Sequence, residues 1–147
     1  MTHHNPPDET LRQVLTQATT IAMVGASSNP EKPSHGIMKK LLSAGYRVIP
    51  VNPRETEVLG QKAVPSLDAI AEKVDIVDVF RRAEDTPPIA DEAVKIGARV
   101  LWLQSGIRNE EAAARATAGG LVVVMDRCIG VTHAQLRIPP KASVSAR

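Results

Sequence analysis

The chain has 147 residues, of which 43% are hydrophobic and 23% are charged, a balance typical of a globular protein with one domain. A net charge of +2 and three aromatic residues of the Trp, Tyr and Phe types argue against nucleic-acid binding. No segment has the roughly 20 consecutive apolar residues that span a bilayer, and no signal-peptide pattern is present. A single cysteine excludes an internal disulfide. We expect a cytoplasmic protein of one domain, residues 1–147, with flexible ends at 1–7 and 139–147.

Helical and strand patterns alternate along the chain. An amphipathic helix is predicted first, because Leu11, Val14, Leu15 and Ala18 recur at helical spacing. The strand patterns are apolar throughout, which is typical of parallel strands buried on both faces. These patterns predict a Rossmann-like, doubly wound α/β domain with about five parallel strands and helices on both faces, in three α/β/α layers. Strands are predicted at 20–24, 47–53, 74–80, 99–106 and 121–126. Helices are predicted at 8–18, 36–45, 87–98 and 109–120, with a further short helix from about Ser66.

The loop after the first strand, GASSNPEKPSHG, has the composition of a phosphate site. Gly25 permits close backbone approach, Ser27, Ser28 and Ser34 supply hydroxyls, and Lys32 supplies a positive charge. The free N–H groups and the positive end of the following helix favour an anion. The alternative interpretation is structural: Gly25 makes a tight turn and Ser34 caps the helix.

Known nucleotide fingerprints do not fit this loop. G-x-G-x-x-G is absent, and so is the carboxylate that holds the ribose of a nicotinamide dinucleotide at the end of the second strand. A Walker A motif is absent too. What remains is an ADP-like ligand whose ribose end meets neutral or basic groups. Arg54, Arg81 and Arg82 follow predicted strands and are candidates to pair with phosphate, unless they are ordinary surface arginines.

Four segments together carry a family resemblance. They are VGASSNPEKPSHGIMKKLLSAGYRVIPVNP, VDIVDVFRR, LWLQSG and VVVMDRCIG, and the likeness runs from about Thr20 to Leu136. The chain resembles the stand-alone bacterial CoA-binding domain family, which is similar to the N-terminal domain of the succinyl-CoA synthetase alpha subunit. The resemblance implies that the ligand is coenzyme A (CoA) or an acyl-CoA. Near the CoA pyrophosphate it implies Gly25, Ala26, Ser27, Ser28, Lys32 and Ser34.

The same resemblance assigns the rest of the ligand. It implies that Arg54 meets the 3′-phosphate and that Phe80 and Arg81 border the adenine. The synthetase carries a Thr-Glu-Gly strand end near the pantetheine arm, and here Ser105 or a neighbour replaces the glutamate. The residues implied to line the nucleotide are Val51, Asn52 and Pro53, and those implied near the pantetheine arm are Gln104, Ser105 and Gly106.

The sequence contains no recognisable catalytic motif or metal-ligand spacing. The lone cysteine, Cys128, lies where the CoA thiol would arrive. One hypothesis is that it forms a mixed disulfide with CoA, and the alternative is that it is a small buried hydrophobic residue. We expect a CoA-binding protein without enzymatic activity and without a nucleic-acid or membrane partner, and no protein partner is indicated. The alternatives are an NAD(P)-dependent oxidoreductase and a non-catalytic subunit of a larger acyl-CoA ligase.

Overall fold

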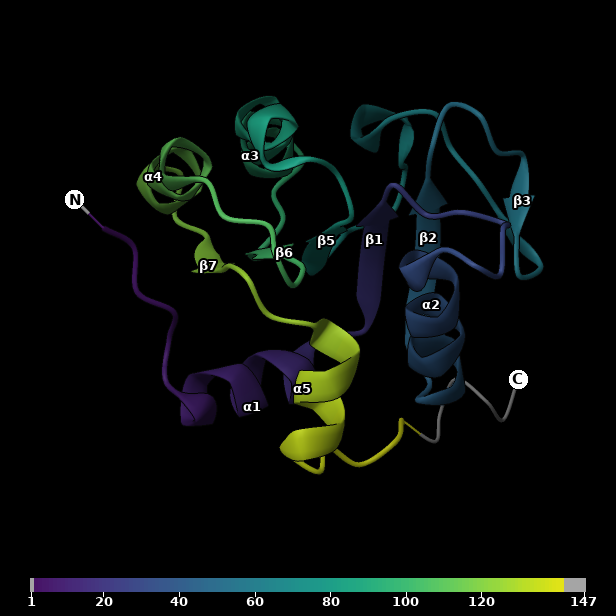
Figure 1. The fold of residues 1–147 in the computed structure, drawn as a ribbon, viewed down its shortest axis with the longest axis horizontal. Coiled ribbons are helices and arrows are strands. Elements are labelled where there is room, and N and C mark those ends of the chain that lie inside the picture. Colours follow the sequence, from purple (N-terminus) through teal and green to yellow (C-terminus); the bar gives the residue numbers. More distant parts are fainter. Residues whose placement is uncertain (1, 142–147) are drawn as a thin grey trace.

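The computed structural model describes residues 2–141 and contains a five-stranded sheet with all strands parallel. The spatial order of the strands is β2-β1-β5-β6-β7 (Figure 1). This order confirms the doubly wound α/β fold that the apolar strand patterns predict. The strands are β1 (Thr20–Val24), β2 (Arg47–Val51), β5 (Ile76–Val79), β6 (Val100–Leu103) and β7 (Val122–Val124).

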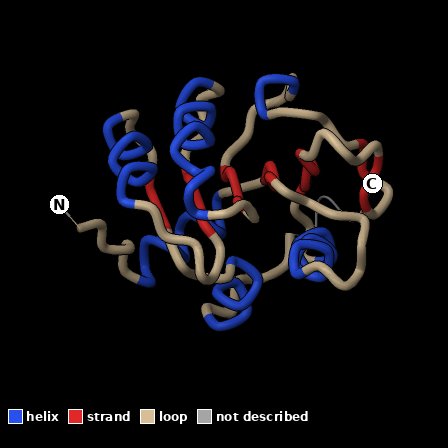
Figure 2. Tube along the Cα trace, turned by 45° about the horizontal axis from the view of Figure 1, so that its top comes forward, coloured by secondary structure: helices blue, strands red, loops and turns tan. Residues whose placement is uncertain are grey.

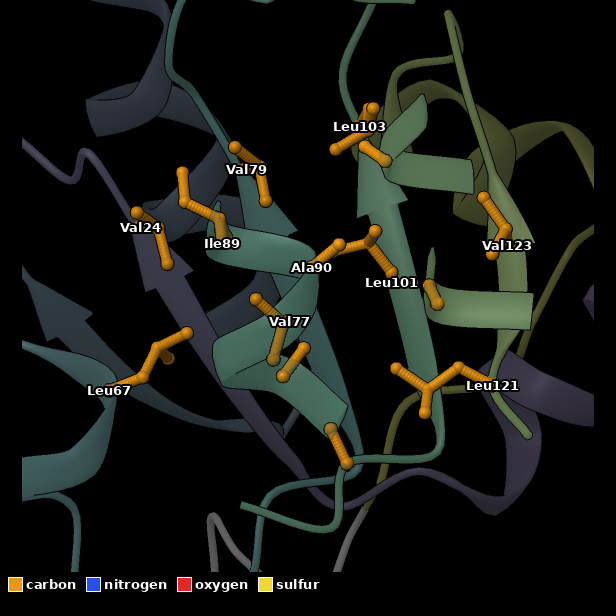
Figure 3. Packing of buried hydrophobic residues seen from close by; sticks show 14 of the residues in the cluster. Val24, Leu67, Val77, Val79, Ile89, Ala90, Leu101, Leu103, Leu121 and Val123 are labelled. Atoms are coloured by element: carbon orange, nitrogen blue, oxygen red, sulfur yellow. The ribbon is translucent and has the colours of Figure 1, made fainter. Parts of the chain in front are cut away.

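Helices cover both faces of the sheet (Figure 2). Successive residues of a strand point alternately into two hydrophobic cores, one on each face. Ile21 and Met23 of β1 face the side that holds α1, α2 and α5, whereas Ala22 and Val24 face the side of α3 and α4. Figure 3 shows this second core, in which Ala90 of α3 lies among strand residues. The helices are α1 (Asp8–Gln17), α2 (Pro33–Ser43), α3 (Thr86–Lys95), α4 (Glu110–Ala118) and α5 (Ile129–Gln135).

The direction in which the chain adds strands reverses between β1 and β5. From β1 the chain passes through α2 to β2 on one side, and from β5 it continues through β6 to β7 on the other. The loops that leave β1 and β5 therefore diverge, which opens a crevice at the carboxyl ends of these two strands. Ligands of doubly wound domains bind at this kind of switch point.

A small hairpin lies between β2 and β5. Its strands are β3 (Glu57–Val58) and β4 (Gln61–Lys62), and the turn at Leu59 and Gly60 has positive φ angles of 50° and 77°. Two successive positive φ angles are the mark of a tight hairpin turn. The helix expected from about residue 66 is only one 3₁₀ turn, η1 (Leu67–Ala69), and a second 3₁₀ turn, η2 (Ala83–Asp85), precedes α3.

The helices differ from the sequence-based expectation mainly at α2 and α5; in addition, α3 ends at Lys95 rather than at residue 98. α2 begins at Pro33 rather than at Gly36, because proline at the first helical position loses no hydrogen bond. α5 was not predicted, since seven residues that include Gly130 and Thr132 give a weak helical pattern. Packing stabilises α5 instead: Ile129 is fully buried against the core. Among residues 2–141, no helix is long and apolar enough to cross a membrane.

Both end segments make defined contacts. The side-chain amide of Asn5 donates to the carbonyl of Met125 and accepts from its N–H, each at 2.8 Å. At the other end, the N–H of Lys141 donates to the carbonyl of Ala44 at 2.7 Å. These contacts give residues 3–5 and 139–141 a place on the fold, while their mobility stays a prediction. Residues 142–147 lie outside the described part of the chain.

Candidate functional site

A cleft of about 1070 Å³ lies at the carboxyl edge of the sheet. Its walls come from the loops that follow β1, β2, β5, β6 and β7, so the switch point lies at its floor. Most of the residues predicted for the site therefore meet in one place. The predicted residues that line the cleft are Gly25, Ser27, Lys32, Ser34, Asn52, Pro53, Arg54, Phe80, Arg81, Gln104, Ser105 and Cys128.

Gly25 lies where the ends of β1, β2 and β5 meet. Its N–H donates to the carbonyl of Val51 at 2.9 Å, and the N–H of Phe80 donates to the carbonyl of Val24 at 2.8 Å. With φ at +91°, Gly25 adopts a conformation that favours glycine, and a Cβ atom there would lie 2.5 Å from the carbonyl oxygen of Phe80. No side chain fits, so the backbone itself forms this part of the cleft floor.

The first turn of α2 presents an uncapped helix end to the cleft. Lys32 is the N-cap residue, but its side chain makes no capping hydrogen bond, and Pro33 begins the helix. Ser34 is only 3% exposed, lines the cleft, and its hydroxyl has no hydrogen-bond partner within residues 2–141. The Lys32 and His35 N–H groups are bonded to the Asn29 and Lys32 carbonyls, each at 3.0 Å, and Pro33 has no N–H. The Ser34 N–H, the positive helix end and the Lys32 charge therefore favour an anion at this position.

All charged residues that line the cleft, among those described, are positively charged. Lys32, Arg54, Arg81 and Arg82 contribute four cations, and no Asp or Glu is among the lining residues of the described chain. Arg82 lies 3.6 Å from the carboxylate of Asp85, whereas Arg54, Arg81 and Lys32 form no salt bridge within residues 2–141. Guanidinium groups without a carboxylate partner are suited to pair with phosphate.

Four of the predicted site residues are outside the lining of the cleft. Ala26 and Val51 are buried and lie behind its wall, and the Ala26 carbonyl accepts from the side-chain amide of Asn52 at 2.8 Å. Ser28 turns away to the carboxylate of Glu55. Gly106 donates its N–H to the Asp126 carboxylate at 2.6 Å. Ser28 and Gly106 thus join neighbouring loops by hydrogen bonds and are not part of the lining.

Sequence reasoning missed several residues of the lining, most of them apolar. Ile37 and Ile107 line the cleft together with Pro33, and Arg82, which we considered only as a general phosphate partner, also lines it. A signal for Ile37 was present, because it follows Ser34 by three residues and so lies on the same face of α2.

A buried carboxyl group supports the cleft from below. Asp78 of β5 is fully buried; its Oδ1 accepts from the Gln104 side chain at 2.5 Å, and its Oδ2 has no partner within the described chain. Gln104 also accepts from the N–H of Ile129 at 3.4 Å, so the pair supports the start of α5. Burial raises the pKa of Asp78 to about 8, although the Gln104 hydrogen bond opposes the rise. Asp78 is therefore mainly protonated at neutral pH.

Cys128 is half-buried and lines the cleft at the N-cap of α5. The neighbouring Arg127 points elsewhere: its Nε donates to the Thr132 hydroxyl at 2.9 Å, and a terminal nitrogen lies 3.3 Å from the Asp8 carboxylate.

His133 is buried against Tyr46, with ring centroids 5.8 Å apart, and does not line the cleft. No group of three or more His, Cys, Asp or Glu residues is arranged to hold a metal in the part of the chain that is described.

Comparison with known proteins adds independent observations. The sequence pattern of a protein family described as a CoA binding domain matches residues 19–134. YneT of Bacillus subtilis, an uncharacterized protein, is 45% identical over 130 residues, which cover 88% of this chain and 96% of YneT. The alpha subunit of ADP-forming acetate–CoA ligase II of Pyrococcus furiosus is 30% identical over 129 residues; the match covers 79% of this chain and 28% of that subunit. The structure of a hypothetical protein from Pyrococcus horikoshii has a TM-score of 0.87 at 40% identity, covering 93% of this chain and 99% of that one.

Proposed function

The chain belongs to the CoA-binding domain family, as the resemblance predicted, and from that premise we propose that its cleft binds coenzyme A or an acyl-CoA. The observation that carries the proposal is the charge of the cleft, with four cations and no carboxylate among the described lining residues. CoA has a pyrophosphate and a separate 3′-phosphate, so it needs several cations in one cleft. An uncapped helix end beside Lys32 supports the same ligand class.

In this proposal each part of the lining has a role. Ser27, Lys32 and Ser34 hold the pyrophosphate at the start of α2, and Arg54 pairs with the 3′-phosphate. Phe80 borders the adenine, with Arg81 beside it. Gln104 is largely taken up by Asp78, which leaves Ser105, Ile107 and Cys128 for the pantetheine arm. When bound, CoA supplies a thiol or thioester, and the chain's own residues orient and shield it.

A nicotinamide dinucleotide is the less favourable ligand for this cleft. Its adenosine ribose is normally held by a carboxylate at the end of the second strand. Here that position is Asn52, whose amide donates to the Ala26 carbonyl, and the nearby Glu55 accepts from Ser28. Both ends of the Asn52 amide are thus engaged, since its Oδ1 accepts from the Arg54 N–H, and NAD finds no free carboxylate acceptor at this strand end.

A thermal-unfolding panel with CoA, acetyl-CoA, NAD, NADP and ATP tests the proposal. A ligand at 100 times its Kd stabilises the folded state by about 2.7 kcal/mol, which shifts the midpoint by several degrees for a domain of this size. We expect shifts with CoA and acetyl-CoA that exceed those with NAD, NADP and ATP. A shift with NADP and none with CoA would refute CoA binding.

The proposal includes binding without catalysis. We expect acetyl-CoA incubated with the protein to release free thiol no faster than it does in buffer. Faster release that depends on protein concentration would mean that the chain is an enzyme.

The similarity to a ligase alpha subunit favours a second candidate, a role as one part of a larger assembly. Co-elution of a ligase-type partner from lysate during size-exclusion chromatography would support that role.

A further inference from the structure

Two loops of the cleft are joined by direct hydrogen bonds. Oε2 of Glu55 accepts from the Ser28 N–H at 2.8 Å and from the Ser28 hydroxyl at 3.0 Å. The Asn52 side chain donates to the Ala26 carbonyl at 2.8 Å. Figure 1 shows the β1–α2 loop extending toward the chain that follows β2. We call these contacts between residues 26–28 and 52–55 the loop clasp.

The loop clasp holds the backbone of Arg54 in place. Its N–H donates to Oδ1 of Asn52 at 3.0 Å, and the N–H of Glu55 donates to the Asn52 carbonyl at 3.2 Å. The backbone on both sides of Arg54 is therefore fixed to Asn52, which in turn bonds the β1–α2 loop at Ala26. The Arg54 side chain itself is exposed, lines the cleft and forms no ion pair within residues 2–141.

The clasp also determines where negative charge lies. Glu55 follows Arg54 directly, and a free carboxylate there would compete with phosphate for the guanidinium group. Instead, Ser28 gives Glu55 two hydrogen bonds, and Glu55 is not among the residues that line the cleft. A carboxylate that accepts a backbone N–H and a hydroxyl has much of its hydrogen-bonding capacity satisfied.

We propose that Glu55, held by Ser28, is a positioning residue that keeps Arg54 directed toward the 3′-phosphate of CoA. This inference rests on the proposed function. The contact between Ser28 and Glu55 would make the cleft prefer CoA over dephospho-CoA, which lacks the 3′-phosphate. Ser28 therefore acts on the ligand through Glu55, not by touching the pyrophosphate as the resemblance implied.

The test compares Kd values for CoA and dephospho-CoA, measured by isothermal titration calorimetry on the full chain. Glu55→Ala is expected to lower the preference for CoA by roughly three- to tenfold, since one charge-assisted contact is lost. Ser28→Ala is expected to have a smaller effect, because it removes only the hydroxyl bond at 3.0 Å and keeps the backbone N–H bond at 2.8 Å. Since Glu55→Ala already removes both bonds, the double variant should lose no more than Glu55→Ala alone. Glu55→Gln keeps an oxygen acceptor and should retain the preference within about twofold.

Glu57→Ala is the matched control, because this nearby glutamate is exposed and does not line the cleft. Thermal midpoints without ligand show whether each variant folds. An unchanged CoA preference in Glu55→Ala, or additive losses in the double variant, would overturn the inference while leaving CoA binding intact. A wild-type chain that binds neither ligand would overturn the proposed function and this inference together.

Discussion

Replacing Asp78 by asparagine should stabilise the fold at neutral pH. Asp78 is fully buried and its pKa is raised to about 8 from the usual 3.8. At pH 7 the unfolded chain releases this proton freely, whereas the folded chain keeps it. At pH 7 the cost is set by the roughly three units between the usual pKa of 3.8 and the pH. At about 1.36 kcal/mol per unit it reaches up to about 4 kcal/mol. Asparagine carries no charge, and its Oδ1 still accepts from Gln104.

The same reasoning gives the pH dependence. Because the folded pKa of Asp78 lies above the unfolded one, its contribution to stability falls as pH rises from about 4 to about 8. We expect Asp78→Asn to gain about 2 to 4 kcal/mol at pH 7; the gain can be smaller than the full cost, because the Nδ2 of asparagine adds unpaired donors to the core. The gain should grow by about 3 kcal/mol between pH 5 and pH 7.5.

Urea unfolding at both pH values measures this gain, provided that the transition is two-state. His133, whose pKa is lowered by burial and then by Lys40 and Lys141, works in the opposite direction, since its contribution rises with pH. Subtracting the wild-type curve from the variant curve cancels that effect. A gain that is the same at pH 5 and pH 7.5 would refute the claim that Asp78 is buried in its protonated form.

Asp75 provides the matched control in the same region of the chain. Its burial alone would raise its pKa, but hydrogen bonds from Thr19 and Thr20 outweigh burial and lower it. Its stabilising effect is therefore present at neutral pH and is lost as pH falls through the folded pKa. Asp75→Asn should destabilise the protein at pH 7, the opposite sign to Asp78→Asn.

Three further changes test the cleft. Gly25→Ala should destabilise the fold by roughly 2 to 4 kcal/mol in thermal unfolding, because it combines a positive φ with a 2.5 Å approach to backbone; Gly60→Ala, with a positive φ and open space, should cost only about 1 kcal/mol. Arg54→Ala should weaken CoA about tenfold more than dephospho-CoA, whereas Arg99→Ala, an exposed arginine at the opposite edge of the sheet, should change neither Kd; equal losses for both ligands would remove the 3′-phosphate assignment. The Cys128 thiolate should attack a sulfur of CoA disulfide, forming a mixed disulfide and releasing one CoA thiol; an unmodified protein mass would disprove the reaction, and Cys128→Ser is the control.

The sequence predicted the sheet well because its strands are buried on both faces. Continuous apolar runs such as IAMV and VLWL leave little choice other than a parallel sheet between helix layers. The hairpin strands and α5 were not predicted, because elements of two and seven residues carry too little periodicity. Packing against the finished core stabilises α5, and that core is not visible in a local pattern.

The site was predictable as far as strand ends are predictable. Residues next to Gly25 and after β2 come together because parallel strands end at the same edge. Which neighbours face inward was harder: Ala26 and Ser28 were expected at the ligand, yet one is buried and the other bonds Glu55. The contact between Ser28 and Glu55 spans 27 residues, so only the three-dimensional arrangement of the loops reveals it. The burial of Asp78 was equally hidden within an apolar strand.

The contacts of the first residues have a consequence for how the molecule behaves among its own copies. β7 is an edge strand, and an open strand edge offers unpaired backbone groups to which another chain can add. Here the ring of His3 meets the Val123 carbonyl at 2.9 Å, and Asn5 takes both backbone groups of Met125. Two side chains thereby make hydrogen bonds to backbone groups with which an added strand would otherwise pair. Strand addition at this edge, and aggregation through β7, would therefore first require those side chains to leave.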